Sequence, residues 1–172
     1  MKRILSRVRI KWIVYILELI IIFVLQNTPG LIPTFLNVKP MLLIIFAVSI
    51  TMFEGEGKGM WIGLIAGLLM DLGSAMVFGF HAMLMTVVCF FCGILVVYLM
   101  RNNLVTSMVL AAASVFVVGL FQWFFKFALW GDSGTWYFLY GVLLPRIVYT
   151  TLLMPIAFYF NRAIATHLED EE

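Results

Sequence analysis

The sequence predicts an all-α membrane protein with six transmembrane helices and both termini in the cytoplasm. Of its 172 residues, 64% are hydrophobic and only 12% are charged, and the mean hydropathy is +1.09. Soluble domains carry about twice this share of charged residues. Apolar runs of about 18 residues or more have the length needed to cross a bilayer. We therefore expect residues 1–172 to form a single integral membrane domain.

The first element begins with a basic segment, residues 1–11, which is followed by an apolar run from Trp12 to Leu25. No cleavage motif of small residues precedes Pro29, so we interpret this run as a retained first membrane helix that enters from the cytoplasm. The run contains Glu18, about two helical turns inside the inner boundary. Its carboxylate can reach the headgroups, pair with a nearby basic side chain, or belong to a polar site.

A proline-containing loop follows over residues 26–40. Pro29, Pro33 and Pro40 exclude a continuous helix here. The loop also contains five apolar side chains, Leu31, Ile32, Phe35, Leu36 and Val38. We therefore expect the loop to lie at the outer membrane interface or against a partner protein.

Five further spans are predicted from the remaining apolar runs. A polar turn over residues 54–58 separates the second span from the third, and the third is short unless its helix continues through residues 73–77. Pro145 and Pro155 are expected to interrupt the sixth span, and an acidic cytoplasmic tail, residues 163–172, follows it. The predicted spans cover residues 41–53, 59–72, 80–100, 104–125 and 137–160.

The third span carries glycine at every fourth position. Gly59, Gly63 and Gly67 form a ridge with almost no side chain, and Asp71 continues the same spacing. Such a ridge allows the backbone of another helix to approach closely. The ridge is consistent with packing inside the protein and with an oligomer contact, either to a second copy of this chain or to another protein.

The basic residues support the proposed orientation. Eight of the eleven Lys and Arg residues fall on the cytoplasmic side, as the positive-inside rule requires. Those eight are Lys2, Arg3, Arg7, Arg9, Lys11, Lys58, Arg101 and Arg162.

Two opposite charges are predicted at matching depth. Counted at about 1.5 Å per residue from the inner boundary, Asp71 lies about 18 Å deep and Arg146 about 22 Å deep. We expect them to form a structural ion pair between the third and sixth spans, with a ligand cavity or a partner contact as alternatives. His81 is expected to be an interfacial hydrogen-bonding residue, and the alternative is a ligand or proton carrier.

No catalytic set of residues is apparent in the sequence. The sequence contains no Ser/His/Asp arrangement, no cluster with metal-ligand spacing and no phosphate-binding loop. Cys89 and Cys92 lie in an apolar run, where we expect them to pack as small apolar residues. We therefore expect neither an enzyme nor a bound metal or cofactor.

The order of these features resembles the rod shape-determining protein MreD family of bacterial membrane proteins. The resemblance covers essentially the whole chain, although Met41 stands where many members have an acidic residue. The residues that carry it are Lys39, Pro40, Gly59, Gly63, Gly67, Leu68, Leu69, Met70, Asp71, Leu72, Gly79, Phe80, His81, Ala82, Leu144, Pro145 and Pro155.

The resemblance implies a non-enzymatic scaffold in the bacterial inner membrane that belongs to the cell-elongation machinery. Such proteins associate with the bitopic protein MreC, and through it with actin-like MreB filaments and peptidoglycan synthases. The family fold is similar to the six-helix substrate-binding component of energy-coupling-factor vitamin transporters. A vitamin-binding transporter component is therefore the alternative function.

A scaffold mechanism is preferred because few polar side chains fall in the outer half of the predicted bundle. The expected body is a rigid platform held by Asp71 and Arg146. Its glycine face, or the loop from Pro29 to Pro40, would hold the membrane helix of an MreC-like partner.

Overall fold

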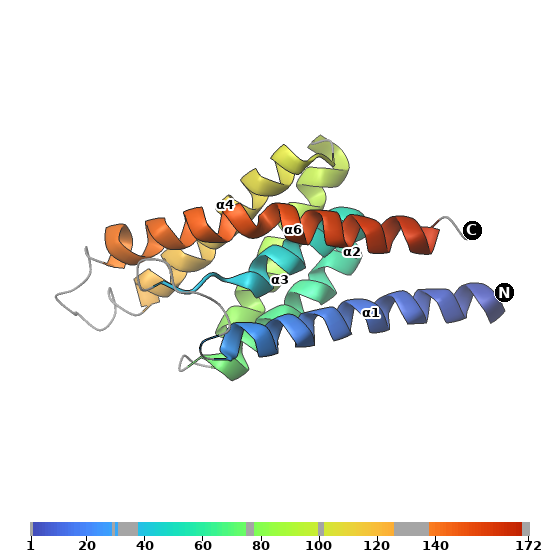
Figure 1. The fold of residues 1–172 in the computed structure, drawn as a ribbon, viewed down its shortest axis with the longest axis horizontal. Helices are drawn as coiled ribbons and strands as arrows, with labels where there is room; N and C mark the ends of the chain where they lie inside the picture. Colours follow the sequence, from blue (N-terminus) through green and yellow to red (C-terminus); the bar gives the residue numbers. More distant parts are fainter. Residues whose placement is uncertain are drawn as a thin grey trace.

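The computed structural model describes residues 2–28, 30, 38–74, 78–99, 102–125 and 138–169. The described residues form a bundle of long helices, shown in Figure 1. The elements are α1 (Lys2–Asn27), α2 (Leu42–Gly73), α3 (Phe80–Ile94), the π-helix η1 (Leu95–Leu99), α4 (Leu104–Trp123), the π-helix η3 (Phe138–Leu143) and α6 (Leu144–Glu169).

Four helical segments of the described chain are long and apolar enough to cross a membrane, judged by length and composition. The predicted first, fourth, fifth and sixth spans correspond to them. These segments are Ile10–Asn27, Phe80–Leu99, Leu104–Trp123 and Tyr140–Thr166.

The second and third predicted spans lie together in α2, which folds back on itself. Gly55 breaks the helix with a φ of 80° and a ψ of −177°, a conformation that suits glycine. A Cβ added to Gly59 would lie 2.3 Å from the Thr51 side chain. In a straight helix these two residues would be about 12 Å apart. The polar turn was therefore placed correctly, and Figure 1 shows the two limbs of α2 meeting at it.

The first and last helices extend beyond the predicted spans at the two ends of the chain. The first helix starts at Lys2, so the basic segment before Trp12 is also helical. The last helix continues through Pro155 to Glu169 and includes residues that we expected in the acidic tail. A proline removes only one backbone N–H, and the other hydrogen bonds of α6 keep it continuous.

The first limb of α2 forms the centre of the bundle. Every residue from Leu43 to Met52 is buried. The backbone N–H groups at the start of this limb bond to side chains of two neighbouring helices. Met41 N donates to Thr150 Oγ1 of α6 at 3.2 Å, and Leu43 N donates to Gln26 Oε1 of α1 at 3.1 Å. The first limb is thereby tied to α1 and α6 where it begins.

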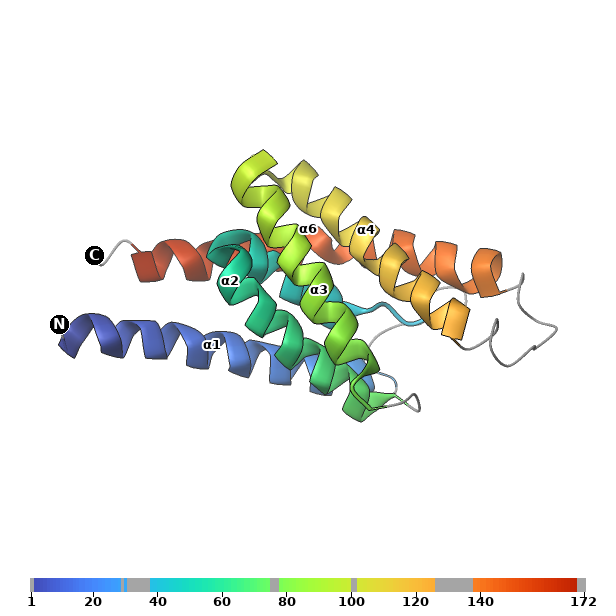
Figure 2. The same ribbon diagram turned by 180° about the vertical axis from the view of Figure 1, so that it is seen from behind.

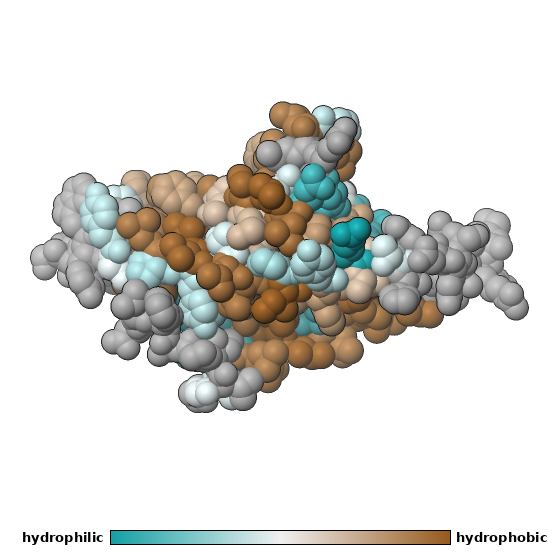
Figure 3. Space-filling view, turned by 45° about the horizontal axis from the view of Figure 1, so that its top comes forward, coloured by the Kyte–Doolittle hydropathy of each residue, from teal (hydrophilic) through white to brown (hydrophobic). Residues whose placement is uncertain are grey.

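Apolar side chains cover the outside of the bundle. Ile13 and Leu17 of α1 are 63% and 57% exposed, and Val148 and Leu152 of α6 are 64% and 67% exposed. Figure 3 shows such hydrophobic residues over much of one face. A surface of this kind is expected where lipid or another membrane helix replaces water. Figures 1 and 2 show the start of α1 and the end of α6 at the same end of the molecule.

Candidate functional site

The glycine ridge is covered inside the bundle: Gly59 packs against Thr51 of the first limb of α2, and Gly63 and Gly67 lie against α3. A Cβ added to Gly63 would lie 2.4 Å from the Met85 carbonyl oxygen, and one added to Gly67 would lie 2.4 Å from the Ala82 Cα. Both glycines are buried, and α2 and α3 form the most extensive helix contact of the bundle. The internal-packing interpretation of the ridge is therefore supported. The hypothesis that this face captures a partner is wrong, because α3 already occupies it.

The proline loop is described only in part. Pro40 is buried directly before α2. Pro29 and Pro33 lie outside the described residues. A contact between this loop and a partner therefore stays a prediction.

Asp71 caps the first turn of α3. Its Oδ1 accepts hydrogen bonds from the backbone N–H of His81 at 3.0 Å and from the His81 ring Nδ1 at 2.8 Å. Its Oδ2 accepts from the backbone N–H groups of Gly79 at 2.9 Å and Ala82 at 3.2 Å. Gly79 stands at the N-cap position and has no side chain, so Asp71 supplies the cap from α2. A carboxylate at this place also complements the positive end of the helix dipole.

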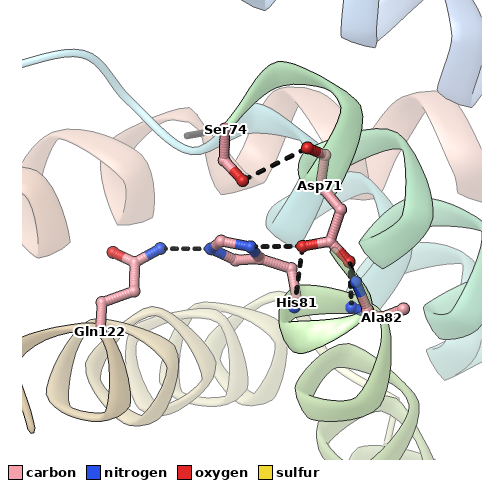
Figure 4. Close-up of polar contacts among 6 residues, drawn as sticks. Asp71, Ser74, His81, Ala82 and Gln122 are labelled. Carbon is pink, nitrogen blue, oxygen red and sulfur yellow. Dashed lines mark hydrogen bonds and ion pairs between the residues drawn. The ribbon is translucent and has the colours of Figure 1, made fainter. Parts of the chain in front are cut away.

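A chain of polar contacts runs from Asp71 to Arg146, and Figure 4 shows its first part. The His81 ring Nε2 lies 2.7 Å from Gln122 Nε2, and Gln122 Oε1 accepts a hydrogen bond from Arg146 Nη1 at 3.5 Å. The directions of these bonds agree if His81 is neutral, donates from Nδ1 to Asp71 and accepts at Nε2 from Gln122. The chain joins the end of α2 to the ends of α3, α4 and α6.

The expected direct ion pair between Asp71 and Arg146 is not present among the described residues. The charges are instead connected through His81 and Gln122. The reason is local, because α2 ends two residues after Asp71 and the start of α3 lies directly against the Asp71 carboxylate. His81 is 2% exposed and forms hydrogen bonds to Asp71 and Gln122, while its expected place at the membrane interface stays a prediction.

Glu18 lies apart from this chain, on the inward face of α1. It is 6% exposed, and neither carboxyl oxygen has a hydrogen-bond donor among the described residues. The nearby polar side chain is Asn161 of α6, whose Nδ2 donates to the Ala157 carbonyl oxygen at 3.1 Å and whose Oδ1 has no hydrogen-bond partner in the described part of the chain. Glu18 therefore faces α6 inside the bundle and does not extend to the membrane surface.

Sequence reasoning missed a second polar cluster, at the turn of α2. The Glu54 side chain is 3% exposed and forms ion pairs with Lys11 of α1 and, at 2.6 Å, with Lys58. Tyr15 of α1 donates a hydrogen bond to the same carboxylate at 3.0 Å. The sequence does contain an indication of this cluster, because Glu54 stands four residues before Lys58, a spacing at which opposite charges often pair. The cluster joins α1 to the turn between the two limbs of α2.

This cluster should make the packing of α1 sensitive to acid. Burial raises the pKa of the Glu54 carboxyl, but Lys11 and Lys58 lower it by more, so the pKa lies below its ordinary value. Because the pKa of Glu54 is lower in the folded protein, its ionised carboxylate stabilises the fold at pH values above the unfolded pKa, about 4.3. This stabilisation is lost as the pH falls through the pKa of the folded protein. We expect Glu54→Gln to lower the thermal midpoint at pH 7 and to have little effect in strong acid. An equal effect of Glu54→Gln at both pH values would contradict this.

The chemistry of the described residues is that of a packed bundle. Cys89 and Cys92 are free and buried, and Cys89 packs against Gly63. No group of three or more His, Cys, Asp or Glu residues that could hold a metal ion is found in the described part of the chain. The polar side chains of this part bond to one another, to helix ends and to carbonyl oxygens of their own helices, which suits a structural role.

Comparison with known proteins agrees with this picture. The family model for the rod shape-determining protein MreD matches residues 6–164, nearly the whole chain. The search of curated proteins and the search of solved structures each returned no match. Several apolar helices of membrane-spanning length fit an inner-membrane protein of this kind. The chain belongs to the MreD family of rod shape-determining proteins.

Proposed function

We propose that this protein is a non-enzymatic membrane scaffold that holds an MreC-like bitopic partner within the machinery for cell elongation. Membership of the MreD family supports a role in rod shape determination. The observation that carries the scaffold role is the chain from Asp71 to Arg146, which links the ends of four helices to one another. A body with fixed helices can present a constant surface to a partner.

The proposed topology has six passes with both termini in the cytoplasm. The two limbs of α2, which meet at Gly55, supply two passes in addition to the four long apolar segments. The start of α1 and the end of α6 at one end of the molecule support an even number of passes (Figure 2). The proposed similarity to the substrate-binding component of energy-coupling-factor transporters rests on the family alone.

The partner surface is proposed on the exposed apolar sides of α1 or α6, or on the loop that leads to Pro40. The glycine ridge is occupied by α3 and is not available for this purpose. Indirect partners would be MreB filaments and peptidoglycan synthases, reached through the MreC-like protein.

Polar groups support the scaffold over a vitamin-binding component. A binding component would direct several polar side chains into a cavity that opens to the ligand. Here His81 and Gln122 bond to each other, and Asp71 is saturated by α3. The hydrogen bonds of these groups are therefore made within the protein and not to a ligand.

Depletion in a rod-shaped host tests the proposed function. We expect cells that lose the protein to become round, and a plasmid copy of the wild-type chain to restore rods. A plasmid copy of Ser74→Ala is the matched control, because the one hydrogen bond of Ser74 Oγ within the described chain is to the Asp71 carbonyl oxygen, at 3.4 Å. Depleted cells that keep their rod shape and instead require an added vitamin would contradict the scaffold and favour the transporter function.

A further inference from the structure

Arg146 carries a positive charge that the described part of the chain leaves without an acidic partner. Its Nη1 donates one hydrogen bond, to Gln122 Oε1 at 3.5 Å, the outer limit of such a bond. Its Nε is buried and has no hydrogen-bond partner among these residues. The nearest carboxylate along the chain of contacts, Asp71, already accepts four hydrogen bonds from α3. A charge in this condition inside an apolar helix is costly and calls for a counter-ion.

The position of Arg146 brings it close to one surface of the membrane. It lies six residues after Tyr140 of η3, where the apolar segment that continues into α6 begins, or about 9 Å along the helix axis. Its contact, Gln122, stands one residue before the end of α4. An arginine side chain can extend several ångströms toward the headgroups from such a place. The guanidinium is therefore within reach of lipid phosphates.

The surroundings favour a lipid over a soluble anion. Leu144 and Val148 of α6 are 52% and 64% exposed, and because each is two residues from Arg146 they lie on the side of the helix away from it; Arg146 itself is directed toward α4. Phe124 and Phe125 at the end of α4 are also exposed. Apolar side chains next to exposed aromatic rings are typical of the level where acyl chains meet headgroups. A lipid could place its chains against the exposed rings of Phe124 and Phe125 and its phosphate at Arg146, beside Gln122.

We propose that Arg146, assisted by Gln122, binds the phosphate of a phospholipid headgroup at this end of the bundle. The guanidinium has a planar set of donors that matches two phosphate oxygens, and the described residues use only one of these donors. The lipid phosphate is the anionic partner of Arg146, since Asp71 does not contact Arg146 directly. This site is independent of the proposed partner binding.

The test compares lipid binding by the purified full-length protein and its variants. The protein in detergent is titrated with phosphatidylglycerol, with diacylglycerol of the same chains and with inorganic phosphate, and bound lipid is counted by native mass spectrometry. The thermal midpoint is measured in parallel. We expect tight binding of phosphatidylglycerol alone, weakened about tenfold in Arg146→Gln through the loss of a charge-assisted bond. Lys39→Gln, which removes an exposed cation just before α2, is the matched control and should bind as the wild type.

Each outcome of the titration has one meaning for the lipid site. Unchanged binding in Arg146→Gln, or an equal loss in Lys39→Gln, would overturn the proposal. If inorganic phosphate stabilised the protein as much as phosphatidylglycerol does, the site would bind a free anion and the lipid proposal would be overturned. Retained lipid with loss of a co-purified protein in Arg146→Gln would assign Arg146 to a partner carboxylate. If Arg146→Gln does not fold, Arg146→Lys keeps the charge without the forked geometry, and binding equal to the wild type would contradict the proposal.

Discussion

Replacing Gly67 by alanine is expected to destabilise the protein strongly and to abolish rod-shape complementation. The new Cβ would lie 2.4 Å from the Cα and 2.7 Å from the backbone nitrogen of Ala82, and 2.5 Å from the carbonyl oxygen of His81. Backbone atoms cannot move aside as a flexible side chain can. Overpacking of this kind costs about 1–3 kcal/mol. Here it also displaces the turn of α3 that Asp71 caps. Thermal unfolding in detergent and a cell-shape assay measure the two effects.

Gly57→Ala is the matched control for this substitution. An added Cβ at Gly57 meets nothing within 4 Å, and the residue is exposed near the turn of α2. Alanine also favours a helix over glycine by about 1 kcal/mol, so this variant should be as stable as the wild type or slightly more stable. If Gly67→Ala is as stable as Gly57→Ala, the close contact of α2 and α3 is not as described.

Replacing Asp71 by leucine is the second change with a large expected effect. Three backbone N–H groups of α3 and the His81 ring nitrogen would lose their acceptor. Each buried donor left unpaired costs about 1–3 kcal/mol, so the loss should exceed that of an ordinary core substitution. We expect Asp71→Leu to fail to accumulate in the membrane or to unfold at a much lower temperature.

Asp71→Asn distinguishes the cap from the charge. Asparagine is also a good cap and can accept at one oxygen, but its amide nitrogen would face N–H donors. We expect intermediate stability for this variant and near wild-type stability for Ser74→Ala. Equal stability of Asp71→Leu and the wild type would show that Asp71 does not cap α3. The measurement is thermal unfolding, followed by the shape assay for variants that accumulate.

The class of the fold could be predicted because a bilayer restricts the choices. Long apolar runs must become helices, and the run from Glu54 to Lys58 had to turn because glycines and charges interrupt it. The glycine spacing correctly indicated a close helix contact. It could not indicate which helix makes that contact, since an i, i+4 ridge has the same pattern for internal and external partners.

The polar network could not be predicted from spacing and depth. Depth placed Asp71 and Arg146 at the same level, but it carries no information about rotation around each helix axis. The start of α3 at Phe80, soon after α2 ends at Gly73, brings the first turn of α3 to Asp71. Gln122 was one of several polar residues in the fifth span, and only the folded arrangement shows that it links His81 to Arg146.

The most direct test of the scaffold is a pull-down of the tagged protein from its native membranes in gentle detergent. Stoichiometric partners are then identified by mass spectrometry. We predict a single-pass MreC-like protein at equal yield, with cell-wall synthases at lower yield, and loss of both in Gly67→Ala but not in Gly57→Ala. Recovery of a multi-pass transporter subunit with ATPases would contradict the scaffold function.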